Sequence, residues 1–307
     1  MTDFLGWEWV FFLNVPVAAV MVVLGPLLLR ESRAPRRPRA FDTAGAVTAT
    51  AAMVACVYAV ERAPSAGWLS PQTLGLLVAA ALLAALFGAI ERRVTAPLVP
   101  PRLFRTGTVT GGNTVMFLLG SCAFGAPYTI AQYGQGPLSW SALRSGLTTV
   151  PLPALAAVGA YAGQALVSRL GTRAVAVGGL TLIGCACALL SSVPANGSFT
   201  RDLLPGLLLF GPGLGACAVA GTAAALGGVA ERDSGVASGL STASFQIGGA
   251  FGVAVASSVA ASCTTAHDAA SGHRAAFTAC AVLAATAVCC AFLLLRRPPL
   301  PQLPGSP

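Results

Sequence analysis

The residues that could do chemistry in this sequence are few and scattered. Its two histidines, His267 and His273, lie on either side of Asp268 in one connecting segment. Such a group could bind a metal ion or sense pH, but we favour a solvated loop for residues this isolated. The nine cysteines lack the paired spacing of a zinc or disulfide site. The sequence therefore predicts no catalytic residue, no metal and no cofactor, and a membrane enzyme is only a remote alternative.

Composition places these residues in a membrane protein. Of 307 residues, 55% are hydrophobic and only 9% are charged, against about 25% charged residues in ordinary soluble domains. Mean hydropathy is +0.77. Charge gathers in short clusters between apolar stretches of about 20 residues, the length that crosses a bilayer. A soluble enzyme is excluded, and the net charge of +8 is attributed to membrane topology rather than to nucleic-acid binding.

Nine apolar segments are separated by clusters of charge, proline and glycine. Each segment is apolar on nearly all faces and rich in small residues, which is typical of helices packed within lipid. The predicted fold class is an all-α polytopic membrane protein with nine transmembrane helices. The segments lie near residues 8–29, 43–61, 71–91, 109–133, 142–168, 172–193, 203–229, 235–262 and 273–295.

Arginine, the only basic residue apart from histidine, is distributed unequally over alternate connections. Fourteen arginines fall on one side of the membrane and four on the other. Because cytoplasmic loops retain positive charge, this predicts a cytoplasmic C-terminus and, with nine helices, an external N-terminus. Residues 1–5 contain no signal peptide, so we expect the first helix to be an interior helix of a longer protein in the cell inner (plasma) membrane.

A series of motifs runs in one consistent order along the chain. The motifs occupy residues 6–17, 42–45, 97–105, 145–151, 163–173 and 235–250. Together they resemble the fourteen-helix drug:proton antiporters of the major facilitator superfamily, from helix six to helix fourteen. Ser168, Thr242 and Phe245 depart from the family pattern.

The resemblance implies a domain organisation. Residues 1–30 would be the last helix of the N-terminal bundle, 31–106 two inserted helices with cytoplasmic linkers, 107–297 a complete C-terminal six-helix bundle, and 298–307 a disordered cytoplasmic tail. Helices one to five of the family have no counterpart here, so we expect a truncated fragment.

The resemblance also implies a function, which is proton-coupled export of small amphipathic or cationic molecules by alternating access in the lipid bilayer. The alternatives are a non-transporting remnant and a half-transporter. A half-transporter would need a separate N-terminal fragment or a second copy of the chain.

Proton coupling needs an ionisable group inside the membrane, yet all ten acidic residues fall at or near segment ends. Glu8 is the deepest, and because Trp7 and Trp9 flank it we interpret it as interfacial. The ten are Asp3, Glu8, Glu31, Asp42, Glu61, Glu91, Asp202, Glu231, Asp233 and Asp268.

Uncharged polar residues within the spans are candidates for a substrate cavity. A buried amide is costly in lipid, so each should face a neighbouring helix or a water-filled cavity, and interhelical hydrogen bonding is the plain alternative. Asn113 and Gln132 lie on the helix that lines the central cavity in the resembling superfamily. The candidates are Asn113, Tyr128, Gln132, Gln164 and Gln246.

The turn containing Gly163, Arg169, Gly171 and Arg173 is a candidate cytoplasmic gate. Its arginines could bond to helix-end carbonyls or acids in one conformation and release them in another. The alternative is that they serve only to set topology.

Helix packing is expected at small or motif residues. Two glycine pairs, each spaced four residues apart, would let helix backbones approach closely. The predicted packing residues are Asn14, Pro16, Gly211, Gly215, Gly235 and Gly239.

Overall fold

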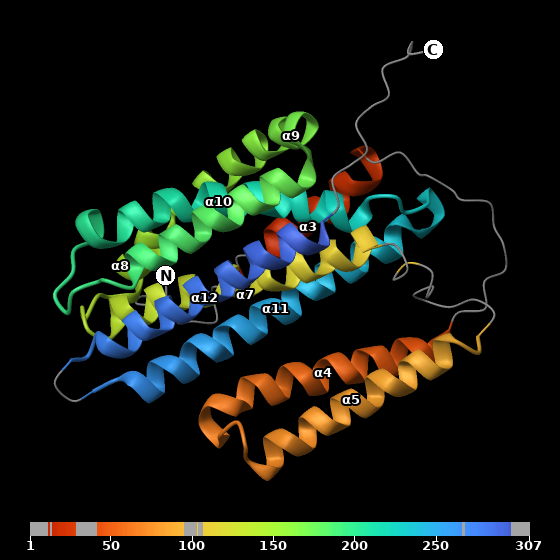
Figure 1. Ribbon diagram of the computed structural model, residues 1–307, viewed down its shortest axis with the longest axis horizontal. Helices are drawn as coiled ribbons and strands as arrows, with labels where there is room; N and C mark the ends of the chain where they lie inside the picture. Colours follow the sequence, from red (N-terminus) through yellow and green to blue (C-terminus); the bar gives the residue numbers. More distant parts are fainter. Residues whose placement is uncertain are drawn as a thin grey trace.

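The computed structural model describes residues 12, 14–28, 42–94, 103, 107–265 and 268–295 of the chain. Apart from an isolated bridge between Thr265 and Asp268, these residues form helices and connecting turns, with no strand among them. Figure 1 shows long helices lying side by side, which confirms the all-α class. In chain order they are α3 (Asn14–Leu28), α4 (Thr43–Ala66), α5 (Pro71–Glu91), α7 (Gly107–Gln135), α8 (Ala142–Thr149), α9 (Pro151–Leu190), the short η1 (Phe199–Leu203), α10 (Leu204–Leu226), the short η2 (Glu231–Asp233), α11 (Ser234–Cys263) and α12 (Ser271–Leu294).

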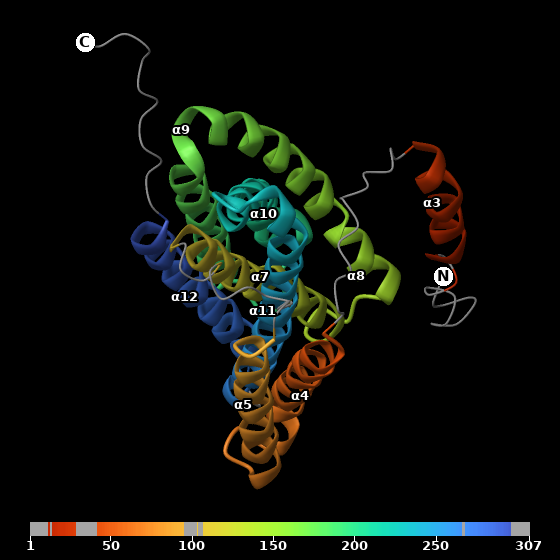
Figure 2. The same cartoon turned by 90° about the vertical axis from the view of Figure 1, so that its right-hand side faces the viewer.

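Seven helical stretches in this part of the chain are long and apolar enough to cross a bilayer. The longest, Ala142–Leu190, has 49 residues and bends at Gly171, whose φ of 82° and ψ of 162° are not helical. Figure 2 shows the resulting arch in α9, so this stretch makes two passes. With that second pass and the shorter apolar helix α3, the described chain accounts for the nine predicted segments.

The helices α7 to α12 pack together around α7, which contacts α10, α11 and α12. Val115, Leu119 and Cys122 of α7 are buried at its centre, against Ile183 of α9 and Cys280 of α12. The Cys122 thiol donates a weak hydrogen bond to the Cys280 carbonyl over 3.8 Å. The small and aliphatic residues that made these segments apolar in sequence thus form this core. A second buried cluster contains Tyr133, Leu203 and Phe277.

Close approach of α11 to α7 depends on glycine. A Cβ atom added at Gly248 would overlap the Phe117 carbonyl, and one added at Gly252 would overlap the Ser121 carbonyl. Small residues therefore set the spacing of this helix pair, as expected for helices associating in lipid.

The helices α4 and α5 form a hairpin at the edge of the molecule. Asp42 caps α4 by accepting a hydrogen bond from the Gly45 N–H over 2.8 Å, and Ser70 caps α5 just before Pro71. In the turn between them, the Trp68 indole N–H donates to the Ser258 hydroxyl of α11 over 2.9 Å. Figures 1 and 2 show the hairpin beside α11, on the side away from α9 and α10.

The remaining helix, α3, lies to one side of the bundle (Figure 2). Its apolar side chains are exposed, with Met21 at 70% and Val22 at 74% of their full accessible surface. The tail predicted over residues 298–307 lies outside the described residues.

Candidate functional site

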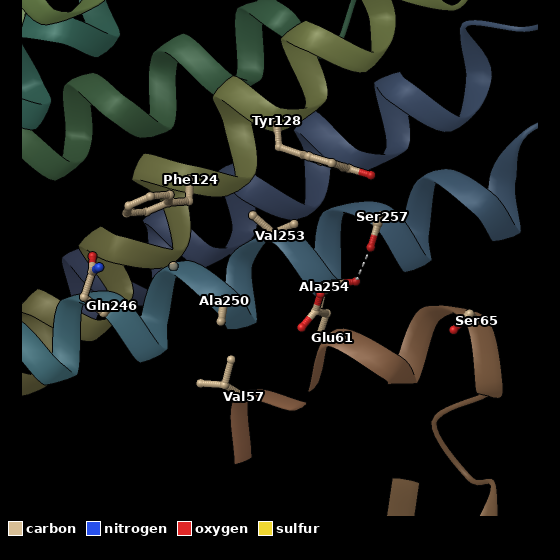
Figure 3. A pocket seen from close by; sticks show the side chains of 11 residues that line it. Val57, Glu61, Ser65, Phe124, Tyr128, Gln246, Ala250, Val253, Ala254 and Ser257 are labelled. Atoms are coloured by element: carbon tan, nitrogen blue, oxygen red, sulfur yellow. Dashed lines mark hydrogen bonds between the residues drawn. The ribbon is translucent and has the colours of Figure 1, made fainter. Parts of the chain in front are cut away.

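A cavity of about 500 Å³ lies between α4, α7 and α11. Figure 3 shows Glu61 and Val57 on α4 facing Tyr128 of α7 and the α11 residues between Gln246 and Ser257. A second cavity of about 390 Å³ adjoins it, and Ser65, Tyr128 and Ser257 line both. The two cavities therefore lie next to each other, and each volume is within the range of pockets that bind a drug-sized molecule.

The hollow arises from small residues on α11. Gly249, Ala250 and Ala254 line the cavity where larger side chains would fill it. A Cβ atom at Gly249 would lie 2.6 Å from the Phe124 ring, so that ring rests directly on the glycine. Phe245 holds the same ring from α11 in an edge-to-face pair with centroids 5.6 Å apart. One wall of the cavity is therefore aromatic, and its Phe124 ring packs on Gly249 and Phe245 of α11.

Glu61 contributes a carboxylate to the cavity, and the sequence reasoning missed it. The apolar segment was predicted to end at residue 61 because Glu61 and Arg62 interrupt it. The candidate membrane span ends two residues later, at Ala63, and the helix α4 continues to Ala66, where the Gly67 N–H donates a hydrogen bond to the Ala63 carbonyl. Glu61 therefore lies inside the helix, about 7.5 Å from its end.

Three of the predicted cavity residues do line this space. Gln246 lies in the larger cavity, Gln132 in the smaller one, and Tyr128 in both. The Gln132 side-chain amide donates to the Tyr128 hydroxyl over 3.3 Å. Ser65 and Ser257 add hydroxyl groups to both cavities, and nothing in the sequence distinguished them because serine is common along these helices.

The other two candidates lie outside both cavities. The Asn113 amide donates to the Val109 carbonyl over 2.8 Å, and its oxygen accepts a hydrogen bond from the Ser244 hydroxyl over 3.2 Å. The bond to Val109 lies within α7, and the bond from Ser244 of α11 is the interhelical bonding that was the alternative for each polar residue. Gln164 is exposed on α9, away from the cavity lining.

The candidate gate residues surround the bend in α9. Gly163 is buried, with the Ala216 Cα 2.7 Å from the position of an added Cβ. Gly171 forms the bend itself. The Arg173 guanidinium carbon lies 4.0 Å from the centre of the Phe292 ring on α12, whereas Arg169 is exposed. Arg173 therefore has a packing partner in addition to its charge.

The predicted packing glycines divide into two groups. A Cβ atom at Gly211 would overlap the Leu155 side chain of α9, and one at Gly215 would overlap the Ala156 carbonyl. By contrast, Gly235 and Gly239 have open space within 4 Å of an added Cβ. Both glycines are exposed on α11, so packing at this second pair stays a prediction that requires other neighbours.

Asn14 and Pro16, also predicted to pack, are exposed on α3. Because α3 lies to one side of the bundle, the six-helix core offers it no burying surface. Their packing role stays a prediction that requires other neighbours.

The sequence analysis favoured a loop for His273, but the residue lies in the first turn of α12. It lines the smaller cavity, and its ring meets that of Tyr133 edge-on with centroids 5.9 Å apart. Asp268 forms an ion pair with Arg274. His267 lies outside the described residues.

The fold and the site define a polytopic membrane protein with a partly apolar cavity between its helices, which is the architecture of a membrane transporter. The family model described as Major Facilitator Superfamily matches residues 1–253. The chain belongs to this superfamily, whose members are transporters rather than enzymes.

Curated relatives are resistance and export proteins. The chain is 33% identical over 255 residues to the tetracenomycin C resistance and export protein of Streptomyces glaucescens, covering 83% of this chain and 47% of that protein. It is 33% identical over 260 residues to the lincomycin resistance protein of Streptomyces lincolnensis, covering 83% and 53%. The chain thus spans about half the length of the curated relatives it matches.

Among solved structures, the chain is similar to the nucleoside transporter NupG, as a D323A mutant, with a TM-score of 0.51 and 14% identity. The match covers 80% of this chain and 66% of NupG. This similarity supports the fold alone.

Proposed function

We propose that the chain takes part in multidrug-type efflux, exporting small amphipathic or cationic molecules across the plasma membrane. The observation that carries this proposal is its 33% identity, over most of its length, to a protein named for antibiotic resistance and export. The cavity supports it, because an aromatic wall and a carboxylate suit a molecule with an apolar body and a positive charge.

Alternating access in this superfamily rocks two six-helix halves against each other around a central site. We assign α7 to α12 as one half, α3 as the last helix of the other, and the α4–α5 hairpin as an insertion between them. The relatives extend well beyond the matched region. The remaining N-terminal half would come from a preceding segment, a separate chain or a second copy.

Proton coupling is proposed from the resemblance to drug:proton antiporters, and a cytoplasmic C-terminus from the fourteen-to-four arginine distribution. On this orientation, the bend at Gly171 lies at the cytoplasmic face. Arg169 and Arg173 would then act as gate residues that affect turnover.

The test is export by cells that express residues 1–307 alone or together with the N-terminal half of the tetracenomycin C export protein. Cells with both halves should accumulate less tetraphenylphosphonium, a lipophilic cation, than cells with either half, and a protonophore should abolish the difference. Co-purification of the halves serves as the control for assembly. Halves that co-purify without changing accumulation would overturn the export function, and halves that fail to associate would overturn the two-half arrangement.

A further inference from the structure

The cavity beside the hairpin contains an uncompensated negative charge. Of the described residues lining the two cavities, Glu61 alone carries a carboxylate. Within the described chain it has no hydrogen-bond or ion-pair partner. Its neighbour Arg62 is directed elsewhere, with its guanidinium carbon 5.4 Å from the centre of the Tyr58 ring. Glu61 is exposed on α4, close to the end of the candidate membrane span at Ala63. A carboxylate within a membrane helix is costly unless a cation, water or another polar group compensates it, which makes Glu61 a candidate binding residue.

The surroundings of Glu61 suit a particular kind of cation. Val57 on the same helix and Val253 and Ala254 on α11 are apolar (Figure 3). Tyr128 and Phe124 present aromatic rings from α7. A small hydrated metal ion would need several oxygen ligands. An organic cation can instead place its charge near one carboxylate and its body against apolar and aromatic walls.

The larger cavity lies beside the hairpin, on the side of the bundle away from the contact between α9 and α10. Figures 1 and 2 show α4 along α11 at the edge of the bundle, and the Trp68–Ser258 hydrogen bond fixes the hairpin there. The inserted hairpin therefore supplies the charged wall, and the bundle supplies the aromatic one.

We propose that Glu61 binds the positive group of an amphipathic organic cation in the cavity between the hairpin α4–α5 and the helices α7 and α11. This inference rests on the proposed export function and assigns it a binding site. It also gives the inserted hairpin a role in substrate binding.

The experiment measures binding of tetraphenylphosphonium to the purified 307-residue chain in detergent, by isothermal titration calorimetry. Glu61→Gln, which keeps the side-chain size and removes the charge, should raise the Kd about tenfold, equivalent to about 1.4 kcal/mol. Glu61→Asp should recover part of the affinity. Glu231→Gln is the matched control, because Glu231 is exposed on η2, away from the cavity, and its Kd should match that of the unmodified chain.

A neutral analogue, triphenylphosphine oxide, should bind equally weakly to the unmodified chain and to Glu61→Gln. Thermal unfolding of each variant verifies that it is folded. Equal tetraphenylphosphonium affinity for Glu61→Gln and Glu231→Gln would overturn the proposal. A second result would also overturn it. If short-chain phosphatidylcholine displaces the probe, and if its affinity falls more than that of the probe in Glu61→Gln, the cavity is a lipid site.

Failure here is distinguishable from failure of the export function. Glu61-dependent binding by the purified chain, without export in cells, would support the site and overturn only the export function. Export unaffected by Glu61→Gln, together with unchanged binding, would overturn only the site.

Discussion

Replacing Gly215 by alanine tests how closely α9 and α10 must approach. An added Cβ would overlap the Ala156 carbonyl and lie 2.5 Å from the Ala160 nitrogen. Ordinary contact begins near 3.4 Å, so the helices would have to separate locally by at least about 0.9 Å. Such overpacking costs about 1–3 kcal/mol, and alanine's better helix propensity returns up to about 1 kcal/mol. We expect a net loss of about 1–2 kcal/mol in the free energy of unfolding.

Gly239→Ala is the matched control, because no atom lies within 4 Å of its added Cβ. It should leave stability unchanged or raise it by up to about 1 kcal/mol. The assay is reversible unfolding of the purified chain in mixed micelles with increasing dodecyl sulfate, followed by circular dichroism. If Gly215→Ala proves at least as stable as Gly239→Ala, close backbone packing of α9 and α10 is refuted.

Three further experiments test individual contacts. In a double-mutant cycle, Arg173→Ala and Phe292→Leu should show a coupling of about 0.5–1 kcal/mol in unfolding free energy, from the loss of their cation–π contact. Trp68→Phe should lower the unfolding free energy by about 1 kcal/mol and weaken tetraphenylphosphonium binding, because it frees the hairpin from Ser258. Asn113→Ala should lower stability by about 1–2 kcal/mol through two lost hydrogen bonds, yet change the Kd for the probe by less than about twofold.

Each of these has a contrary outcome. If the effects of Arg173→Ala and Phe292→Leu on unfolding free energy are additive, the two side chains do not stabilise each other. Unchanged binding in Trp68→Phe would show that the hairpin holds its place without the indole hydrogen bond. A change in probe selectivity in Asn113→Ala, at unchanged stability, would return Asn113 to the substrate cavity.

The fold was largely predictable because its causes are local. Apolar runs of membrane-spanning length, separated by charge, define most of the helices, and the glycine in the Arg169–Arg173 turn marks the bend in α9. Gly211 and Gly215 pack as their spacing predicted. Gly235 and Gly239 share that spacing and face outward, because spacing identifies a helix face but not the side on which a neighbour lies.

The site was less predictable because it depends on tertiary placement. Glu61 was assigned to a segment end on the strength of its charge, although the helix continues past it to Ala66. Its access to the cavity follows from the packing of α4 on α11, which no local pattern specifies. Asn113 and Gln246 are both amides within spans, and the sequence does not distinguish them. In the structure, Asn113 accepts a hydrogen bond from Ser244 of a neighbouring helix, whereas Gln246 lines the cavity.

The most direct test of export is transport into inside-out membrane vesicles that contain the chain together with the N-terminal half of the tetracenomycin C export protein. Membrane potential is held at zero with potassium and valinomycin, and an acid interior is imposed. We predict accumulation of tetraphenylphosphonium that disappears with a protonophore and is absent from vesicles containing either half alone. Accumulation no greater than in vesicles lacking both proteins, with the two halves shown to be associated, would contradict it.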